Sequence, residues 1–365
     1  MSASFLSPTH LELRAKAREV FAALEVKGPQ TDAQLREAVT RTGFFPYLVP
    51  SAFGGSVDKV NVLSLCVLRE ELAYRNAAAD SLFAVQGLGS HPLVLAGSDA
   101  QKQQYLPRVA SGEYLFAFGL TEPEAGSDVA NVQTRAEQTA NGWRLTGKKR
   151  FISNAGVATH YTVFARTGEK LSAFIVPATA KGLRVTPMEL MGEHPIGELT
   201  LTDCEVEAQL GDLGAGMKLA LGTLDIFRST VGAASVGLAR RALDEALSYA
   251  KSRKQFGAPL SELSAVQALL ADSAVELEAS RLLVHQAALT KDQGQARVTY
   301  EAAVAKLFST EAAQRIIDRC LQIHGGNGVV RGAVVERLYR DVRALRIYEG
   351  ATEVQRLVIA RHLLG

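Results

Sequence analysis

The chain has 365 residues, of which 47% are hydrophobic and 21% are charged, which is typical of a globular protein with about two or three domains. Its 40 basic and 38 acidic residues give a formal net charge of +2, so the sequence predicts no nucleic-acid partner. The 3 cysteines are far apart and form no CxxC motif, as expected of free thiols in a reducing compartment. The 7 histidines form no HxxxH pair, so no metal site is predicted.

The N-terminal segment indicates a cytoplasmic protein. It lacks a charged region followed by an apolar run, and it contains Glu12 and Glu19, which a transit peptide would avoid. No apolar run reaches the length of a membrane span, so no membrane partner is expected.

Residues 8–115 are predicted to be mainly helical. Prolines and glycines between residues 46 and 55 mark a loop, and a helix follows it. In that helix apolar residues recur at helical spacing between charged ones, namely Leu63, Val67, Leu68 and Leu72. We therefore place an N-terminal helical domain at residues 1–115.

The pattern changes at residue 116. Short runs at 143–146, 161–165 and 172–176 are rich in β-forming residues and are bounded by turn residues such as Gly142, Gly147 and Gly168. This pattern of short strands and turns favours a compact β domain at residues 116–211.

Residues 212–365 are predicted to form a helical bundle. Apolar residues step by 3 and 4 from Leu224 to Leu238 and again from Leu263 to Leu277. A third helix is expected from about Val298 to Ile323, and a fourth segment passes through residues 338–345. Thr352 and Gln355 form a candidate capping box for a last helix. Long amphipathic helices of this kind favour a bundle.

Five segments combine glycines with groups that could bind a ligand: residues 120–128, 147–156, 253–257, 322–328 and 347–356. Each alone has an ordinary structural explanation, such as a turn, a solvated charge cluster at 148–150 or a helix cap. Phe151 and Ser153 alternate and would share one face of a strand. Glu349 stands between Tyr348 and Gly350, just before the candidate capping box. No segment has the GxGxxG or Walker A pattern of a nucleotide-binding strand–helix unit.

Taken together and in this order, the five segments resemble the acyl-CoA dehydrogenase family, in particular its bacterial short- and medium-chain-like members. The resemblance runs from about Ala22 to the C-terminus and includes Glu70-Glu71-Leu72-Ala73 and residues 336–341. It implies a mainly α fold with a central β domain. The expected parts are a helical N-terminal domain, a middle β-barrel domain and a C-terminal four-helix bundle.

The resemblance also implies that FAD is the cofactor and that two chains share its site. The residues implied to hold the flavin ring are Phe118, Leu120, Thr121, Ser127, Phe151, Ile152 and Ser153, with the Ser153 hydroxyl near N5. The ADP half would be held by a neighbouring subunit through Arg253, Phe256, Gln322, Gly325 and Gly326. Glu353 is a further implied cofactor contact. Such a site implies a homodimer or a homotetramer.

The activity implied is the α,β-dehydrogenation of an acyl-CoA to the 2-enoyl-CoA in fatty acid metabolism. Glu349 would remove the α-proton while the β-hydrogen leaves as hydride to flavin N5, and a base for this step must be desolvated. Implied substrate contacts are Ser127, Asp225, Arg228, Tyr348 and Gly350. Some relatives carry the base on the first bundle helix, but the matching residue here is Phe227, which cannot accept a proton. The implied electron acceptor is an electron-transferring flavoprotein.

Three alternatives stay open at this point. One is a flavin oxidase or monooxygenase on the same scaffold, and another is a dehydrogenase that acts on an acyl-carrier-protein thioester. The third, a DNA-associated flavoprotein, is disfavoured because charges of both signs are interleaved after Met217. The acyl chain length is also open, although the resemblance puts the floor of the acyl pocket near Leu82 to Leu88.

Overall fold

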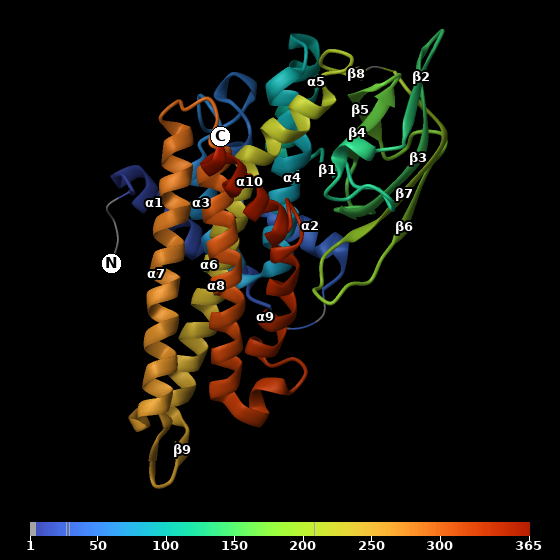
Figure 1. Ribbon diagram of the computed structural model, residues 1–365. Coiled ribbons are helices and arrows are strands. Elements are labelled where there is room, and N and C mark those ends of the chain that lie inside the picture. Colours follow the sequence, from blue (N-terminus) through green and yellow to red (C-terminus); the bar gives the residue numbers. More distant parts are fainter. Residues whose placement is uncertain (1–4, 27, 29, 208) are drawn as a thin grey trace.

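The computed structural model describes residues 5–26, 28, 30–207 and 209–365. Two helical regions lie beside a β region, and the long C-terminal helices extend well beyond both (Figure 1). Short 3-10 segments join the elements: Ala22–Leu24, Phe45–Leu48, Ser51–Phe53, Val129–Asn131, Leu260–Glu262, Gly325–Val329 and Arg343–Arg346. Among the described residues, no helix is both long and apolar enough to cross a bilayer.

The N-terminal region is helical, as predicted. Its helices are α1 (Pro8–Phe21), α2 (Asp32–Arg41), α3 (Val62–Arg75), α4 (Ala77–Ala96) and α5 (Asp99–Ser111). Ser7, Thr31 and Ser98 each form a capping box that satisfies the first backbone N–H groups of α1, α2 and α5. Helices α3 and α4 are buried along most of their length, so they form the centre of this region.

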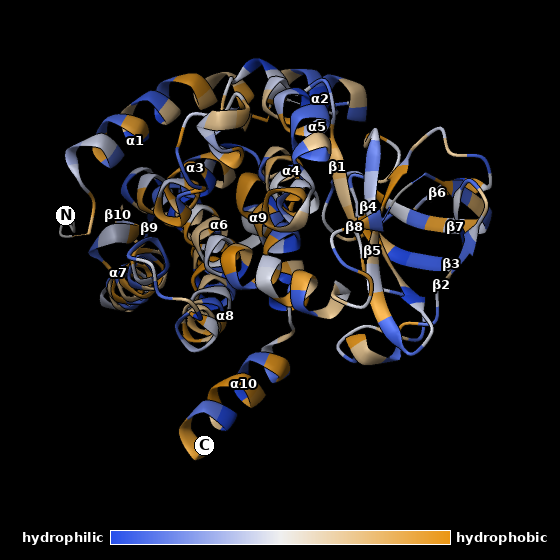
Figure 2. Cartoon of the chain, turned by 90° about the horizontal axis from the view of Figure 1, so that it is seen from above, coloured by the Kyte–Doolittle hydropathy of each residue, from blue (hydrophilic) through white to orange (hydrophobic). Residues whose placement is uncertain are grey.

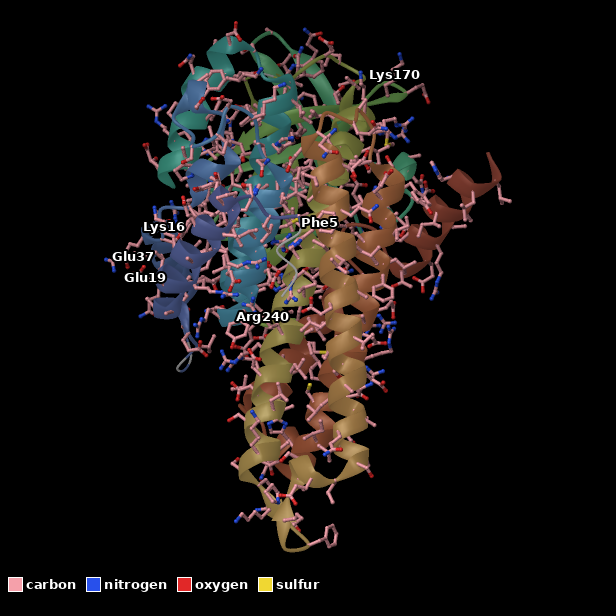
Figure 3. The ribbon with its side chains drawn as sticks, turned by 90° about the vertical axis from the view of Figure 1, so that its left-hand side faces the viewer. Phe5, Lys16, Glu19, Glu37, Lys170 and Arg240 are labelled. Carbon is pink, nitrogen blue, oxygen red and sulfur yellow. The ribbon has the colours of Figure 1, made fainter. Side chains whose placement is uncertain are left out.

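Buried charges join α3 to its neighbours. Glu70 and Glu71 are each 2% exposed, and the guanidinium of Arg240 on α6 binds both at 2.8 and 2.6 Å. Arg281 on α7 approaches Glu70 to 3.2 Å. Burial raises the pKa of Glu70, but Arg281, Arg240 and Arg14 outweigh it and hold that pKa at about 2. Arg240, labelled in Figure 3, thus fastens the N-terminal helices to the bundle.

The predicted middle β domain is confirmed. Its strands are β1 (Phe116–Gly119), β2 (Arg135–Thr139), β3 (Gly142–Ser153), β4 (His160–Thr167), β5 (Lys170–Pro177), β6 (Leu183–Pro187), β7 (Ile196–Val206) and β8 (Gln209–Leu210). They follow the order β6-β7-β3-β2-β4-β5-β8, and β1 runs parallel to β4. The strands of the described residues show no β6–β8 pairing, so the expected barrel is not closed by hydrogen bonds.

The C-terminal region is built on three long helices, α6 (Gly216–Ser252), α7 (Ser264–Asp292) and α8 (Thr299–His324). A small hairpin, β9 (Lys254–Gln255) with β10 (Ala258–Pro259), joins α6 to α7 at the far end of the bundle (Figure 1). Helix α9 (Val334–Val342) packs against α8 and α6. Helix α10 (Thr352–Leu364) points away from the bundle (Figure 2) and buries only Thr352 and Gln355.

The hydrophobic core has three parts. The first joins α1–α5 to the bundle helices and to part of the sheet, the second lies mainly between α6, α8 and α9, and the third lines the inner face of the sheet. Cys66, Cys204 and Cys320 lie in these cores as free, buried thiols, as their spacing predicted.

Candidate active site

Glu349 sits on a strained turn between Arg343–Arg346 and α10. Its φ is +52°, and that of Gly350 is +97°. Left-handed backbone at a residue with a side chain costs free energy, so surrounding contacts must impose it. Glycine is needed at position 350 for a second reason, since a Cβ there would lie 2.2 Å from Nε2 of Gln355.

Three buried side chains hold this turn. Lys306 of α8 donates from Nζ to the Gly350 carbonyl at 2.8 Å. Gln355 of α10 donates to the same carbonyl at 2.9 Å and to that of Glu349 at 3.3 Å. Arg228 of α6 donates from Nε to the Glu349 carbonyl at 3.2 Å. The backbone of Glu349 is therefore fixed from three helices at once.

The carboxylate of Glu349 has an unusual environment. Its Oε2 is buried and has no hydrogen-bond partner among the described residues. Burial raises the pKa of Glu349, and the charges of Arg69, Lys306 and Arg228 oppose that rise. A buried acceptor without a partner is costly to keep in a merely structural role, so this oxygen indicates a functional site.

The neighbouring amine is also perturbed. Lys306 is fully buried, and this burial lowers its pKa to about 8 although the charge of Glu349 raises it. Neither Lys306 nor Gln355 was predicted from the sequence as a site residue. Thr352 and Gln355 do not form the predicted capping box, because the Thr352 hydroxyl donates to Glu311 at 2.5 Å and Gln355 points back to the Glu349 turn.

The predicted substrate positions on α6 lie close to this turn. Arg228 is buried and also donates to the Asp225 carboxylate at 3.2 Å, whose other oxygen accepts from Thr299 at 2.8 Å. Phe227 faces elsewhere: it is 1% exposed and packs edge-on against His91, with ring centres 5.9 Å apart. Asp225 is thus occupied by two donors, whereas the Glu349 oxygen is not.

The residues predicted to hold the flavin ring come from β1, the loop after it and the end of β3. The Arg150 amide donates to the Thr121 carbonyl at 2.9 Å and joins the two segments. Phe118 and Thr121 are half-buried, Leu120 and Ile152 are buried, and Ser127 is exposed on the loop. The structure thus brings most of this set together.

Phe151 and Ser153 differ in environment. Phe151 has a φ of +57° and its ring is 50% exposed, while a shift in the β3–β7 register between Lys149 and Ile152 breaks the simple alternation expected there. The Ser153 hydroxyl lies 3.2 Å from Nε2 of His194, which lies in the β6–β7 loop. His194 was missed in the sequence because that loop has no periodic pattern.

The basic segment 148–150 is not simply a solvated cluster. Lys149 is fully buried and its Nζ binds Glu122 at 2.7 Å, and burial lowers the pKa of Lys149 to about 8. Glu122 also accepts from the Thr134 amide at 2.9 Å and the Gln133 amide at 2.6 Å. This pair ties the loop after β1 to β3 and so fixes one wall of the site.

The residues predicted to hold the ADP half lie at the far end of the bundle. Arg253, Phe256, Gln322, Gly325 and Gly326 are all exposed, and the Phe256 ring is 93% exposed on a φ of +52°. They occupy the hairpin after α6 and the end of α8, far from β1 in Figure 1. Glu353, in the first turn of α10, is exposed too.

The end of α6, just before the hairpin, and the end of α8 are held side by side. The Tyr249 and His324 rings stack with centres 4.4 Å apart, and the Asn327 amide donates to the Tyr249 hydroxyl at 3.0 Å. One chain therefore assembles this distal set of residues but does not bring it to Glu349.

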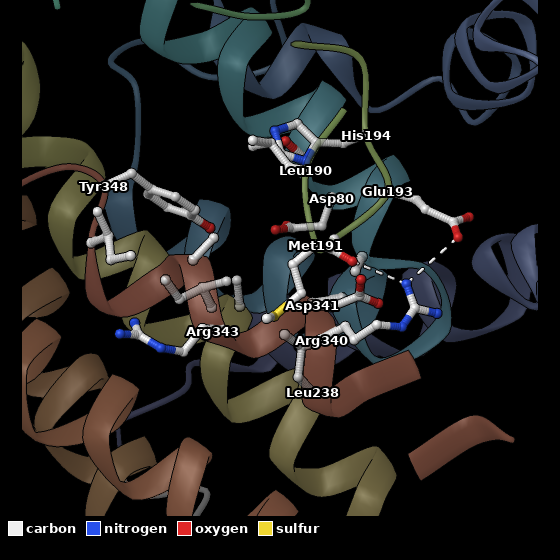
Figure 4. Close-up of a pocket in the computed structure, with 18 residues that line it drawn as sticks. Asp80, Leu190, Met191, Glu193, His194, Leu238, Arg340, Asp341, Arg343 and Tyr348 are labelled. Carbon is white, nitrogen blue, oxygen red and sulfur yellow. Dashed lines mark hydrogen bonds and ion pairs between the residues drawn. The ribbon is translucent and has the colours of Figure 1, made fainter. Parts of the chain in front are cut away.

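A cavity of about 330 Å³ lies beside the Glu349 turn (Figure 4). Its walls come from all three regions. The N-terminal region contributes the end of α3 and the start of α4, and the β region contributes the β6–β7 loop from Leu190 to His194. The C-terminal region contributes α6 and the segment that ends at Tyr348. Asp80 lines the cavity and was not predicted. The cavity therefore connects the neighbourhood of Ser153, through His194, with that of Glu349, through Tyr348.

Family models match almost the whole chain. Those of the acyl-CoA dehydrogenase N-terminal, middle and C-terminal domains match residues 7–113, 117–204 and 214–364. A probable acyl-CoA dehydrogenase of Mycobacterium tuberculosis is 38% identical over 337 residues, covering 90% of this chain and 86% of that protein. The structure of butyryl-CoA dehydrogenase from Megasphaera elsdenii matches with a TM-score of 0.93 and 33% identity, covering 99% of each chain.

Two further similarities bear on partners. A subunit of the caffeyl-CoA reductase–Etf complex of Acetobacterium woodii is 35% identical, covering 91% of this chain and 89% of that subunit. The prolyl acyl carrier protein oxidase AnaB matches with a TM-score of 0.90 and 27% identity, covering 98% of this chain and 99% of that one. With three family models in chain order and a relative that covers nine-tenths of it, the chain belongs to the acyl-CoA dehydrogenase family of FAD-dependent oxidoreductases.

Proposed function

We propose that the protein converts an acyl-CoA thioester to the 2-enoyl-CoA, with Glu349 as the base that removes the α-proton. The observation that carries this proposal is the buried Oε2 of Glu349, which has no hydrogen-bond partner in the part of the chain that the structure describes and stands on a turn held by three helices.

The electrostatics around Glu349 suit this role. The α-proton of a thioester is weakly acidic, so a desolvated carboxylate with a raised pKa is a better base than a hydrated one. Arg69, Lys306 and Arg228 keep its ionised form accessible. The backbone N–H of Glu349 would bind the thioester oxygen as negative charge develops on it. Ser127, Asp225, Arg228, Tyr348 and Gly350 are the proposed substrate contacts.

The residues present fit FAD. When bound, FAD accepts the hydride from the β-carbon. Phe151 offers a half-exposed ring and Ser153 a hydroxyl at the end of β3, and Phe118, Leu120, Thr121, Ser127 and Ile152 complete that wall. Arg253, Phe256, Gln322, Gly325 and Gly326 would hold the ADP half from a second subunit, and Glu353 is a further proposed contact. An exposed aromatic ring beside an arginine suits a flat base and a phosphate.

A shared site requires a homodimer or a homotetramer. Leu357, Leu363 and Leu364 on α10 are 57%, 69% and 88% exposed, which supports burial of this helix against another copy. We also propose that an electron-transferring flavoprotein reoxidises the flavin, in view of the similarity to the Etf-complex subunit. A cytoplasmic location, a role in fatty acid metabolism and domain boundaries at residues 115 and 211 are part of the same proposal.

Anaerobic titration of the FAD-loaded protein with a series of acyl-CoA thioesters tests the reaction. At least one thioester should bleach the flavin absorbance near 450 nm, and the product should be the 2-enoyl-CoA. A properly folded, FAD-loaded protein that no thioester bleaches would refute the assignment.

A carrier-protein thioester is the second candidate substrate, because of the similarity to the prolyl acyl carrier protein oxidase. The chemistry at Glu349 would be the same. Comparing acyl-CoA with the same acyl group on a carrier protein separates these two. Rapid reoxidation of the reduced flavin in air, without an electron-transferring flavoprotein, would instead indicate an oxidase.

A further inference from the structure

A buried ion pair lies next to the proposed base, and its carboxylate has no part in the mechanism above. Arg69 of α3 donates from Nε to Asp80 Oδ1 at 2.9 Å and from Nη2 to Oδ2 at 2.7 Å. Its Nη1 donates to the Thr230 hydroxyl at 2.8 Å. Arg69 and Asp80 are 2% and 4% exposed. All three nitrogens of the guanidinium are thus engaged inside the protein.

The carboxylate of this pair borders the cavity, and its arginine does not. Asp80 and Ser81 line the cavity together with Tyr348 (Figure 4), whereas Arg69, which binds both oxygens of Asp80, is not among the lining residues. The side chains nearby on α3, α4 and α6 are small or apolar, namely Ala73, Ala77, Ala234 and Leu238. Asp80 is therefore a polar group in a largely apolar part of the wall.

This arrangement presents a hydrogen-bond acceptor to whatever occupies the cavity. An ionised carboxylate has about four lone-pair positions, and Arg69 uses one on each oxygen. The remaining positions can accept from a ligand. Since the adjacent guanidinium balances the charge of Asp80, the pair has little net charge and favours a neutral donor over an ammonium group.

We propose that Asp80, held by Arg69, is a specificity-determining residue, and that the substrate is a short acyl thioester that carries a hydroxyl group at the distal end of its acyl chain. This inference rests on the proposed function, since it deepens the substrate class of the same site. The floor of the acyl pocket is then formed at Asp80 and Ser81, just before the segment from Leu82 to Leu88 that the family resemblance indicated.

The stability of the fold does not by itself explain why this pair is present. Removing two charges from water costs more than an ion pair usually returns, so apolar residues of similar size would stabilise this position as well or better. A hydrogen bond from a ligand hydroxyl to the remaining acceptor positions would explain why a polar pair is present here. The pair also acts on the base, because the charge of Arg69 lowers the pKa of Glu349 and that of Asp80 raises it.

Matched thioesters test the proposal on the FAD-loaded protein. 4-Hydroxybutyryl-CoA and pentanoyl-CoA differ only by a terminal hydroxyl in place of a methyl, as do 5-hydroxypentanoyl-CoA and hexanoyl-CoA. In at least one pair we expect kcat/KM for flavin reduction, and calorimetric affinity, to be about tenfold higher for the hydroxyl compound, since hydrogen bonds to charged groups typically give such ratios. Equal values or an alkyl preference in both pairs would overturn the proposal.

A double replacement removes the polar floor without leaving one charge unpaired. The variant Arg69→Leu with Asp80→Leu should fold, because apolar substitution of both partners is tolerated. Its preference should reverse in favour of pentanoyl-CoA and hexanoyl-CoA. Asp80→Asn alone is less suitable, since it leaves Arg69 buried without its counter-ion. The control is Glu25→Leu with Arg75→Leu, a 3.2 Å pair that involves the last residue of α3 and does not line the cavity, and it should keep the wild-type ratio.

The two readouts separate this inference from the proposed function. A protein that binds the hydroxyl thioesters more tightly but never reduces its flavin would refute the dehydrogenase and leave the floor assignment intact. A protein that reduces its flavin equally well with both members of each pair would support the dehydrogenase and refute the floor assignment.

Discussion

The Glu349 turn and the distal set at the far end of the bundle are built in opposite ways. Both use left-handed backbone, with a φ of +52° at Glu349 and at Phe256 alike. At Glu349, however, Arg228, Lys306 and Gln355 converge from three helices and fix the carbonyls. Phe256 is 93% exposed on its hairpin.

The difference shows which part of the site one chain completes. The Glu349 turn is complete within the chain, because the three side chains that hold it come from α6, α8 and α10 of the same chain. The residues of the distal set are exposed at the far end of the bundle, away from the Glu349 turn of the same chain (Figure 1). A strained, exposed aromatic residue is stable only if something else gains from it, and a second copy with its cofactor would supply that.

The largest expected effect comes from Glu349→Gln. Glutamine keeps the size of the side chain and the backbone N–H but cannot accept the proton. Flavin reduction should fall by about 10²–10⁴-fold, the usual contribution of a general base. Stopped-flow absorbance measures the rate, and calorimetry should show nearly unchanged acyl-CoA affinity. Asp225→Asn is the matched carboxylate control, and a larger loss there would transfer the base to Asp225.

The second effect is on pH dependence. Only the ionised Glu349 can act as the base, and burial raises its pKa above the ordinary glutamate range. The rate of flavin reduction should therefore fall about tenfold for each pH unit below that raised pKa. The falling limb should begin at higher pH than for an exposed glutamate and should disappear in Glu349→Gln. A flat profile from pH 4 to 8 would contradict the raised pKa.

The third effect concerns the distal set. Arg253→Ala should weaken FAD binding by about tenfold or more, because a charge-assisted hydrogen bond to phosphate or ribose is lost. The thermal stability of the FAD-free protein should stay within about 0.5 kcal/mol, since Arg253 is exposed. FAD content after gel filtration is the measurement. Full retention of FAD in a stable variant would argue for a site contained in one chain.

The smallest effect compares two glycines directly. Gly350 and Gly257 have φ values of +97° and +85°, but a Cβ would meet Gln355 at 2.2 Å in the first and nothing within 4 Å in the second. Both alanine variants bear the left-handed strain, roughly 1–2 kcal/mol. Gly350→Ala should lose more stability than Gly257→Ala in urea unfolding because it also displaces Gln355. Equal losses would mean that the Glu349 turn is not tightly packed.

Much of the fold could be predicted from periodicity. The steps of 3 and 4 in residues 224–238 and 263–277 correspond to α6 and α7, and the runs at 143–146, 161–165 and 172–176 fall in β3, β4 and β5. Position 349 was singled out only through the family resemblance of five segments taken together, and its role as the base stays a prediction. The environment of Glu349 could not be predicted, since Lys306 and Gln355 reach it from helices where they look like ordinary polar residues.

The burial of Lys149 left a signal that was easy to overlook. Three basic residues in a row suggest a solvated turn, yet alternation from the buried Trp143 and Leu145 places position 149 on the same face of β3. Asp80 and Arg69 gave no comparable signal. Arg69 stands beside two glutamates on α3, and Asp80 follows three alanines on α4, so neither position indicates a partner. Only the packing of α3 on α4 and α6 shows that they pair beside the cavity.

The exposed hairpin has a genetic consequence. If each site takes Glu349 from one chain and Arg253 from another, two defective variants can form active sites when their chains assemble together. In a mixed assembly of Glu349→Gln chains with Arg253→Ala chains, half of the hybrid sites combine an intact Glu349 with an intact Arg253. Two defective alleles expressed in the same cell would then restore activity that neither provides alone, whereas a site confined to one chain would never show such complementation.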